Sequence, residues 1–302
     1  MTAPDSLSAL VAAELAFPPD PNPAMRAARL LAEDIVARHG DAVAAILFYG
    51  SCRRTGETAG LLDLYVLTMG NLAFHRRAIP ALLNAVLPPQ VLHWRRDGVE
   101  GPLRAKVAVM TLRAFERRMR PASIDTTLWA RFCQPTTLVH ARDEGAHRRT
   151  EAAVARAVET AVTWALRLDA PTGPPAALWR HLFARTYGAE LRAERGNRPD
   201  SIVATAPGWF DAVLPAALDR IGRRPSGNWR PAWSLRRLGG KALNIARLVK
   251  AAFTFDGGPD YLADKIARHS GMPVELTPWQ RRHPVLAAPL LLWRLRRRGA
   301  VR

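Results

Sequence analysis

The sequence predicts an α+β protein in which a mixed sheet with helices is followed by a mainly helical second domain. Up to about residue 115, short apolar runs typical of buried strands alternate with helical segments. Beyond that point the chain shows helical periodicity, interrupted by Pro-rich connections such as APTGPP. Hydrophobic residues make up 48% of the chain and charged residues 23%, so the composition allows a substantial core.

The first part of the chain contains the strand candidates. Residues 1–23 are Pro-rich and are expected to form an N-terminal arm, whereas residues 24–39 have apolar spacing near 3.6 and predict a helix that ends at Gly40. The run AVAAILFYG closes on a glycine and is typical of a buried strand, as is LLDLYVLT at 61–68. Further strands are expected at VLHW and KVAVMTL, with a helix over HRRAIPALLNAVL between the second and third strands.

Helical periodicity dominates the second part. It covers residues 124–133, 148–168, 176–195, 208–222, 234–253 and 259–269. We therefore expect four regions along the chain. They are the arm (1–23), the sheet-containing domain (24–120), the mainly helical domain (121–283) and a basic, apolar tail (284–302).

The charge and cysteine content narrow the function classes. The net charge of +18 attracts polyanions such as nucleic acid, nucleotides or an anionic bilayer, although a general preference for arginine explains it equally well. Only two cysteines are present, Cys52 and Cys133, and neither belongs to a CxxC pair, so a disulfide framework is excluded and a reducing compartment is expected. No signal peptide and no apolar run of transmembrane length is found, which favours a cytoplasmic protein.

One motif points to chemistry. A predicted strand ends in Tyr49-Gly50-Ser51, and Asp63 follows after an eleven-residue spacer at the start of the next strand. Gly50 allows the backbone to approach a triphosphate, the Ser51 hydroxyl can donate to phosphate oxygens, and Asp63 can hold Mg²⁺. This layout resembles the nucleotidyltransferase superfamily. The superfamily usually has a second carboxylate two residues further on, where this chain has Tyr65.

The motif also resembles one family, the mitochondrial translocator assembly and maintenance proteins, which are phosphatidate cytidylyltransferases, and their bacterial relatives. The family's single aspartate followed by apolar or aromatic residues is similar to Asp63-Leu64-Tyr65-Val66. Three further segments are similar to family blocks, and together they extend the resemblance over about residues 45–195: Lys106-Val107-Ala108-Val109, Ala130 to Thr136 (with Gln134 where a lysine is usual), and Tyr187 to Arg192.

The resemblance implies a nucleotidyltransferase-like sheet and a Mg²⁺-dependent reaction in which phosphatidate attacks the α-phosphorus of CTP. The products would be CDP-diacylglycerol and pyrophosphate. Lys106 stands in an apolar strand, where an unpaired ammonium is costly, so a phosphate contact is expected there. The implied site comprises Asp63 and Lys106 as catalytic residues, Asp63 also as metal ligand, Tyr49, Gly50 and Ser51 at the nucleotide, Arg131 and Arg192 at substrate phosphates, and Glu190 as a possible acid.

The tail suggests how such an enzyme would reach a lipid. Its apolar part is too short to span a bilayer and is followed by a basic cluster, so we expect a peripheral contact with the inner face of the cell membrane. The expected membrane contacts are Leu290, Leu291, Trp293, Arg294, Arg296, Arg297 and Arg298. The alternative is that the segment packs on the second domain as an ordinary terminal helix.

Two other functions remain open from the residues alone. One is a nucleotidyltransferase that acts on a small molecule or an RNA end, although a polymerase-like enzyme would be expected to keep a second carboxylate near Asp63. The other is a non-enzymatic nucleic-acid-binding protein, which only the charge suggests. Because zinc-finger spacing and an RNP-type aromatic strand are missing, no specific nucleic acid is expected. The eight histidines show no HxxxH or HExxH spacing and are expected to be ordinary surface or core residues.

Overall fold

The computed structural model describes residues 6–58, 60–97, 101–171, 173–189, 198–222, 225–254 and 276–282. Its centre is a five-stranded mixed sheet with the strand order β3-β4-β2-β1-β5. All neighbouring strands are antiparallel except β2 and β4, which are parallel. The strands are β1 (Val43–Tyr49), β2 (Leu62–Thr68), β3 (Gln90–Arg96), β4 (Leu103–Thr111) and β5 (Thr137–Ala141). The predicted fold class is confirmed by this sheet and by the helices that follow it.

One face of the sheet packs against α2 (Pro23–His39), as the apolar spacing of that segment predicts. The helix begins at Asn22, whose side chain accepts a hydrogen bond from Met25 N, and Gly40 follows its last residue. The helix expected over HRRAIPALLNAVL is present as α5 (Ala78–Val86), and a further short helix, α4 (Asn71–His75), precedes it. The break between the two helices lies at Arg76, whose φ of 54° cannot continue a right-handed helix.

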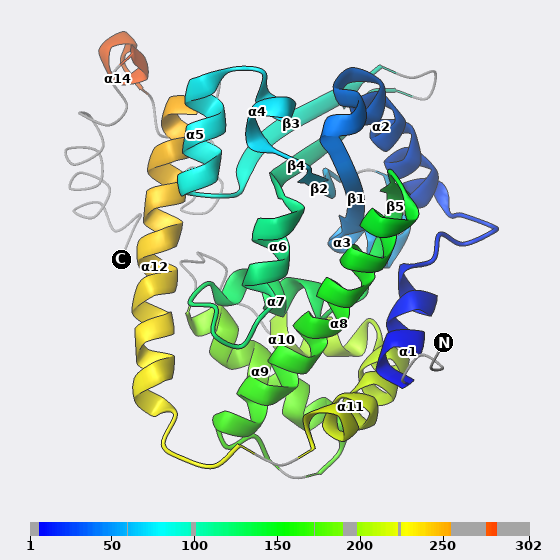
Figure 1. The fold of residues 1–302 in the computed structure, drawn as a ribbon, viewed down its shortest axis with the longest axis vertical. Helices are drawn as coiled ribbons and strands as arrows, with labels where there is room; N and C mark the ends of the chain where they lie inside the picture. Colours follow the sequence, from blue (N-terminus) through cyan, green and yellow to red (C-terminus); the bar gives the residue numbers. More distant parts are fainter. Residues whose placement is uncertain are drawn as a thin grey trace.

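The other face of the sheet packs against helices that follow β4 in the chain, which lie below the sheet in Figure 1. These helices are α6 (Leu112–Arg118), α7 (Thr126–Phe132), α8 (Glu144–Arg167), α9 (Pro175–Gly188), α10 (Arg198–Ala204) and α11 (Pro207–Ile221). Because Leu47, Tyr65 and Ala108 alternate with residues that face α2, they join this second core. The helices therefore cover the sheet face from which Asp63 also projects.

The elements that the sequence did not predict include a helix near the N-terminus and a fifth strand. Residues 1–23 contain the helix α1 (Ser6–Leu15), whose Leu7, Val11 and Leu15 repeat every four residues and are buried in the helical core. Strand β5 lies in the segment expected to be mainly helical, and it pairs with the edge of β1. Pairing of this kind satisfies backbone groups that an edge strand would leave open.

Helix α12 (Arg230–Thr254) runs along one side of the molecule, from the helical part to α5 (Figure 1). A pair of glycines permits close packing. A Cβ on Gly239 would come within 2.6 Å of Ile124 Cγ2, and one on Gly240 within 3.0 Å of Ala189 O. None of the helices in the described ranges, including the short α14 (Pro278–Arg282), is long and apolar enough to cross a bilayer.

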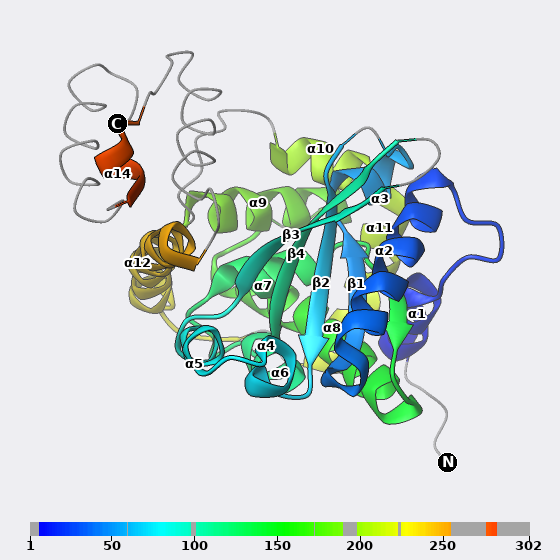
Figure 2. The same ribbon diagram turned by 90° about the horizontal axis from the view of Figure 1, so that it is seen from above.

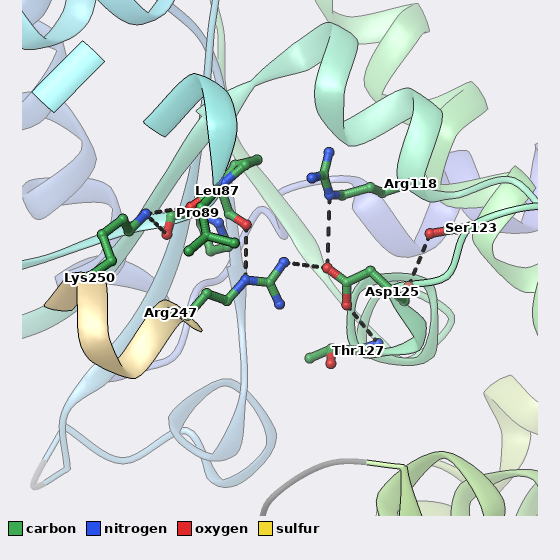
Figure 3. Close-up of polar contacts among 9 residues, drawn as sticks. Leu87, Pro89, Arg118, Ser123, Asp125, Thr127, Arg247 and Lys250 are labelled. Carbon is green, nitrogen blue, oxygen red and sulfur yellow. Dashed lines mark hydrogen bonds and ion pairs between the residues drawn. The ribbon is translucent and has the colours of Figure 1, made fainter. Parts of the chain in front are cut away.

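A polar clamp fastens the second half of α12 (Figure 3). The Arg247 guanidinium bonds the buried Asp125 carboxylate and donates to Pro88 O at 2.9 Å. Lys250 Nζ donates to Leu87 O and Pro89 O at 2.5 and 2.8 Å. The clamp thereby joins α12 both to the loop between α5 and β3 and to the start of α7.

Candidate active site

The sheet register aligns four polar side chains across neighbouring strands. Asp63 on β2 is paired with Tyr49 on β1 and with Lys106 on β4, and Lys106 is in turn paired with His93 on β3. Residues that are directly opposite each other in a sheet project from the same face. Tyr49, Asp63, Lys106 and His93 therefore form one row, which we call the catalytic row, near the end of β1 where Gly50 follows.

Gly50 brings the backbone against the Asp63 side chain. Its φ of 92° and ψ of −164° lie in a region that only glycine adopts readily. A Cβ at this position would come within 2.5 Å of Asp63 Oδ2 and 3.1 Å of Asp63 Cγ. The chain then turns into the short helix α3 (Ser51–Thr55), whose first residue, Ser51, is exposed. The turn predicted from Tyr49-Gly50-Ser51 is thus built around the Asp63 carboxylate.

Arg131 lies beside this row. Its guanidinium carbon is 5.3 Å from the centre of the Tyr49 ring, and the guanidinium also hydrogen-bonds the Tyr49 hydroxyl. Burial raises the pKa of Tyr49 to about 12, and the positive charge of Arg131 opposes that shift. Tyr49 therefore remains a neutral phenol that holds an arginine near the row. Arg131 is partly exposed, so its guanidinium retains access to solvent.

The outer end of the row is basic. Lys106 is partly exposed and His93 is exposed, and each of them also interacts with another group of the protein. The pKa of His93 is lowered, chiefly by partial burial and then by the charge of Lys106. His93 was expected to be an ordinary histidine, and only the pairing of β3 with β4 reveals its position. A sequence-based prediction of that hairpin register would have placed it beside Lys106.

Tyr65 occupies the position where a second carboxylate would stand. Its side chain is fully buried against Phe115 and Phe132, with ring centres at 6.0 and 5.1 Å. Burial raises the pKa of its hydroxyl, which therefore stays protonated. Within the described residues, no group of three or more His, Cys, Asp or Glu side chains could hold a metal ion. A metal at Asp63 would thus depend on oxygens that a substrate or water supplies.

The remaining predicted site residues fall outside the described part of the chain. These residues are Glu190, Arg192, Leu290, Leu291, Trp293, Arg294, Arg296, Arg297 and Arg298. The structure brings together Tyr49, Gly50, Asp63, Lys106 and Arg131 from four separate segments of the chain. Ser51 is placed at the same turn by its direct succession to Gly50.

The chain was compared with family models, curated proteins and solved structures. No family model matches the chain, and no curated protein matches it. Among solved structures, a nucleotidyltransferase-like protein from Exiguobacterium sibiricum 255-15 is similar, with 13% sequence identity and a TM-score of 0.29 over 90% of this chain and 91% of that chain. At this identity and TM-score, the roles of individual residues rest on the geometry of the catalytic row itself.

Proposed function

We propose that this chain is a nucleotidyltransferase whose reaction takes place at the catalytic row. The observation that carries the proposal is the contact between Asp63 and Gly50. A carboxylate lies directly against a backbone segment that no side chain obstructs, and the exposed Ser51 follows. Such a turn lets phosphate oxygens approach the backbone closely. Lys106 and Arg131 add positive charge beside the carboxylate, as a site for a triphosphate requires.

The substrate pair that we propose is CTP and phosphatidate, on the strength of the sequence motifs. An oxygen of the phosphatidate phosphate would attack the α-phosphorus of CTP. The new O–P bond would form while the bond between the α-phosphorus and the oxygen bridging to the β-phosphorus breaks, and pyrophosphate would leave with that electron pair. The chain itself would align the two phosphates and neutralise their charge. Asp63, Lys106 and Arg131 are the side chains that would carry these tasks.

The residues at the row fit Mg²⁺ bound together with a nucleotide. Mg²⁺ is usually held by one or two protein carboxylates plus substrate phosphates and water, and Asp63 provides one carboxylate beside the open backbone at Gly50. When bound, the ion would neutralise charge that develops on the phosphates. Tyr65 cannot contribute a second ligand, because it is buried in an aromatic cluster. We therefore propose one protein carboxylate on this strand instead of the superfamily's usual pair.

The direct test is incubation of the protein with Mg²⁺, one of the four NTPs and phosphatidate in detergent, followed by measurement of pyrophosphate. We expect release that depends on the lipid and is fastest with CTP. Asp63→Asn serves as the matched control for contaminating activity. If no NTP supports lipid-dependent release, the lipid assignment is wrong. Transfer to an RNA end or a small molecule, tested in the same assay, would then separate the broader nucleotidyltransferase proposal from its lipid form.

The lipid substrate leads to a proposed location in the cytoplasm, on the inner face of the cell membrane. The support is the sequence of the tail, in which an apolar stretch with Trp293 precedes a basic cluster. Flotation with anionic liposomes at physiological salt, for the full chain and for a chain ending at Arg282, tests the tail directly. We expect the shortened chain to lose flotation, and equal flotation of both proteins would contradict this role.

A further inference from the structure

A second basic site lies outside the catalytic row. A hollow of 930 Å³ opens between α6, α8 and the start of α12, and this volume is within the range of small-molecule sites. Five arginines line it, against one acidic residue, Glu116. Its aromatic lining comes from Trp164 on α8 and Trp229, which directly precedes α12. We call it the arginine–tryptophan pocket.

The pocket and the catalytic row lie towards opposite ends of the sheet. Asp63 is the second residue of β2, whereas the lining residues Glu116 and Arg120 belong to α6 and the loop after it, which follow the last residue of β4. Because β2 and β4 are parallel, the start of one and the end of the other lie at opposite ends. Figure 2 shows α3 beyond one end of the strands and α6 beyond the other. A ligand in this pocket would therefore not occupy the proposed reaction centre.

Two of the five arginines are neutralised by carboxylates. Arg149 donates from Nε and Nη2 to the two oxygens of Glu116 at 2.7 and 2.9 Å. Arg156 pairs with Glu159 at 2.9 Å. Among the described residues, Arg120, Arg167 and Arg236 have no acidic partner. The pocket thus gathers three cations that no carboxylate among the described residues neutralises.

Arg167 and Arg236 are oriented by tryptophan rings and, for Arg236, by backbone carbonyls. Arg236 is 8% exposed and donates to Ala232 O at 2.9 Å and to Pro121 O at 3.0 Å. Arg167 stacks on Trp229, with its guanidinium carbon 3.9 Å from the ring centre, and Arg236 stacks on Trp164 at 4.1 Å. The Nε atoms of both arginines are buried without a hydrogen-bond partner. Stacking on aromatic rings fixes the orientation of a guanidinium but does not neutralise it.

The surroundings disfavour the charged form of both arginines. Burial lowers the pKa of Arg167, and burial together with the charge of Arg167 lowers the pKa of Arg236. An anion between them would offset this mutual repulsion. Guanidinium groups match phosphate oxygens in geometry, and three unbalanced cations suit a dianion better than a single carboxylate.

We propose that the arginine–tryptophan pocket binds a phosphate monoester dianion through Arg120, Arg167 and Arg236. The dianion would belong to a soluble phosphorylated molecule or to the headgroup of a phosphatidate-type lipid. Arg167 and Arg236 are already oriented by their stacking contacts, so little conformational entropy is lost at these two side chains on binding. This site does not depend on the proposed function, since it shares no residue with the catalytic row.

Calorimetric titration of the full chain with glycerol 3-phosphate, without Mg²⁺, tests the shared chemistry. We expect Arg167→Gln and Arg120→Gln each to raise Kd about tenfold or more, as is typical for loss of a charge-assisted hydrogen bond. Arg148→Gln is the matched control, because it removes the same charge from α8 outside the pocket. Lys106→Gln should leave Kd unchanged, which separates this site from the cations of the catalytic row.

Flotation separates the two sources of the phosphate. Phosphatidylcholine vesicles that contain phosphatidate are compared with vesicles that contain an equal amount of phosphatidylglycerol, which is charged but is not a monoester. If Arg120→Gln loses binding to phosphatidate vesicles but not to glycerol 3-phosphate, the ligand is a lipid headgroup. If it loses binding to glycerol 3-phosphate but not to the vesicles, the ligand is a soluble molecule.

The proposal is overturned if the wild-type chain binds neither probe, or if Arg148→Gln weakens binding as much as Arg120→Gln does. Arg120 keeps the test decisive if Arg167→Gln fails to fold, because the Arg120 side chain is exposed and lies on the loop after α6.

Discussion

The Asp63 carboxylate lies against the backbone of Gly50 so closely that a Cβ on Gly50 would come within 2.5 Å of Oδ2. The backbone conformation requires glycine at this position as well, since the φ of 92° is unfavourable for any other residue. Two separate requirements therefore fall on one residue of this turn. They are expected if the turn must keep a carboxylate close to an unobstructed backbone.

Gly50→Ala should therefore damage both folding and activity. We expect the free energy of unfolding to fall by about 1–3 kcal/mol because the backbone must move or remain strained. Pyrophosphate release should fall further, since the movement displaces Asp63. Gly70→Ala is the matched control, because Gly70 has an extended φ of −162° and open space around its Cβ position. Urea unfolding and the activity assay measure both effects, and a Gly50→Ala protein as stable and active as Gly70→Ala would refute this account of the turn.

Asp63→Asn should abolish turnover while the protein stays folded. The proposed loss of a metal-binding carboxylate should cost several kcal/mol of transition-state stabilisation, or about 10³ in rate. The side chain is partly exposed and asparagine has the same shape, so circular dichroism should remain unchanged. Ser51→Ala should reduce the rate less, because backbone donors remain. Near-normal turnover by a folded Asp63→Asn protein would remove Asp63 from the reaction.

Lys106→Ala should reduce turnover much more than Arg113→Ala, which removes an exposed cation from α6. The reason is the sheet register, which places Lys106 directly beside Asp63. Lys106→Arg should restore only part of the activity, because a planar guanidinium is bulkier than the compact ammonium. The comparison uses kcat and KM for CTP in all four proteins. Complete restoration by arginine would show that any cation at this position suffices.

The sequence predicts the central strands and the helices of this fold well, because strong local patterns mark them. Burial requires the continuous apolar run of β1 and the helical apolar spacing of α2, and both patterns can be read from the sequence itself. The helix expected over residues 75–87 is present as α5, but it begins only at Ala78 because Arg76 has a left-handed φ, and the short α4 before it was not expected. Strand β5 has only five residues between helical segments, and only its pairing with β1 identifies it.

The candidate site likewise contains some residues that the sequence reveals and others that only the fold reveals. Gly50, Ser51 and Asp63 form a motif that is visible in the sequence. His93 joins the row only through the register between β3 and β4, and the arginine–tryptophan pocket combines residues from α6, α8 and α12. Contacts between such distant segments leave no local pattern. Two lysines also have different roles: Lys106 lies in the row, whereas Lys250 fastens α12.

Lys250 leads to a prediction about pH. Its side chain is 7% exposed, and burial, followed by the charge of Arg247, lowers its pKa from 10.5 to about 8. Between these two values the unfolded chain holds the Lys250 proton, whereas the folded protein has released it. Since the unfolded state then binds more protons, this group makes the folded state more stable as pH rises through the window. The contribution is at most about 1.4 kcal/mol per pH unit.

Urea unfolding at about pH 7.5 and pH 9.5, for the wild type and for Lys250→Met, measures the effect. Burial raises the pKa of Cys133, which makes stability fall with rising pH and so opposes Lys250. The informative quantity is therefore the difference between the two proteins. We expect the wild type to gain stability relative to Lys250→Met at the higher pH. Lys241→Met, on the same helix but partly exposed, should follow the wild type. Parallel pH profiles for all three proteins would mean that the Lys250 ammonium keeps its proton against the carbonyls of Leu87 and Pro89.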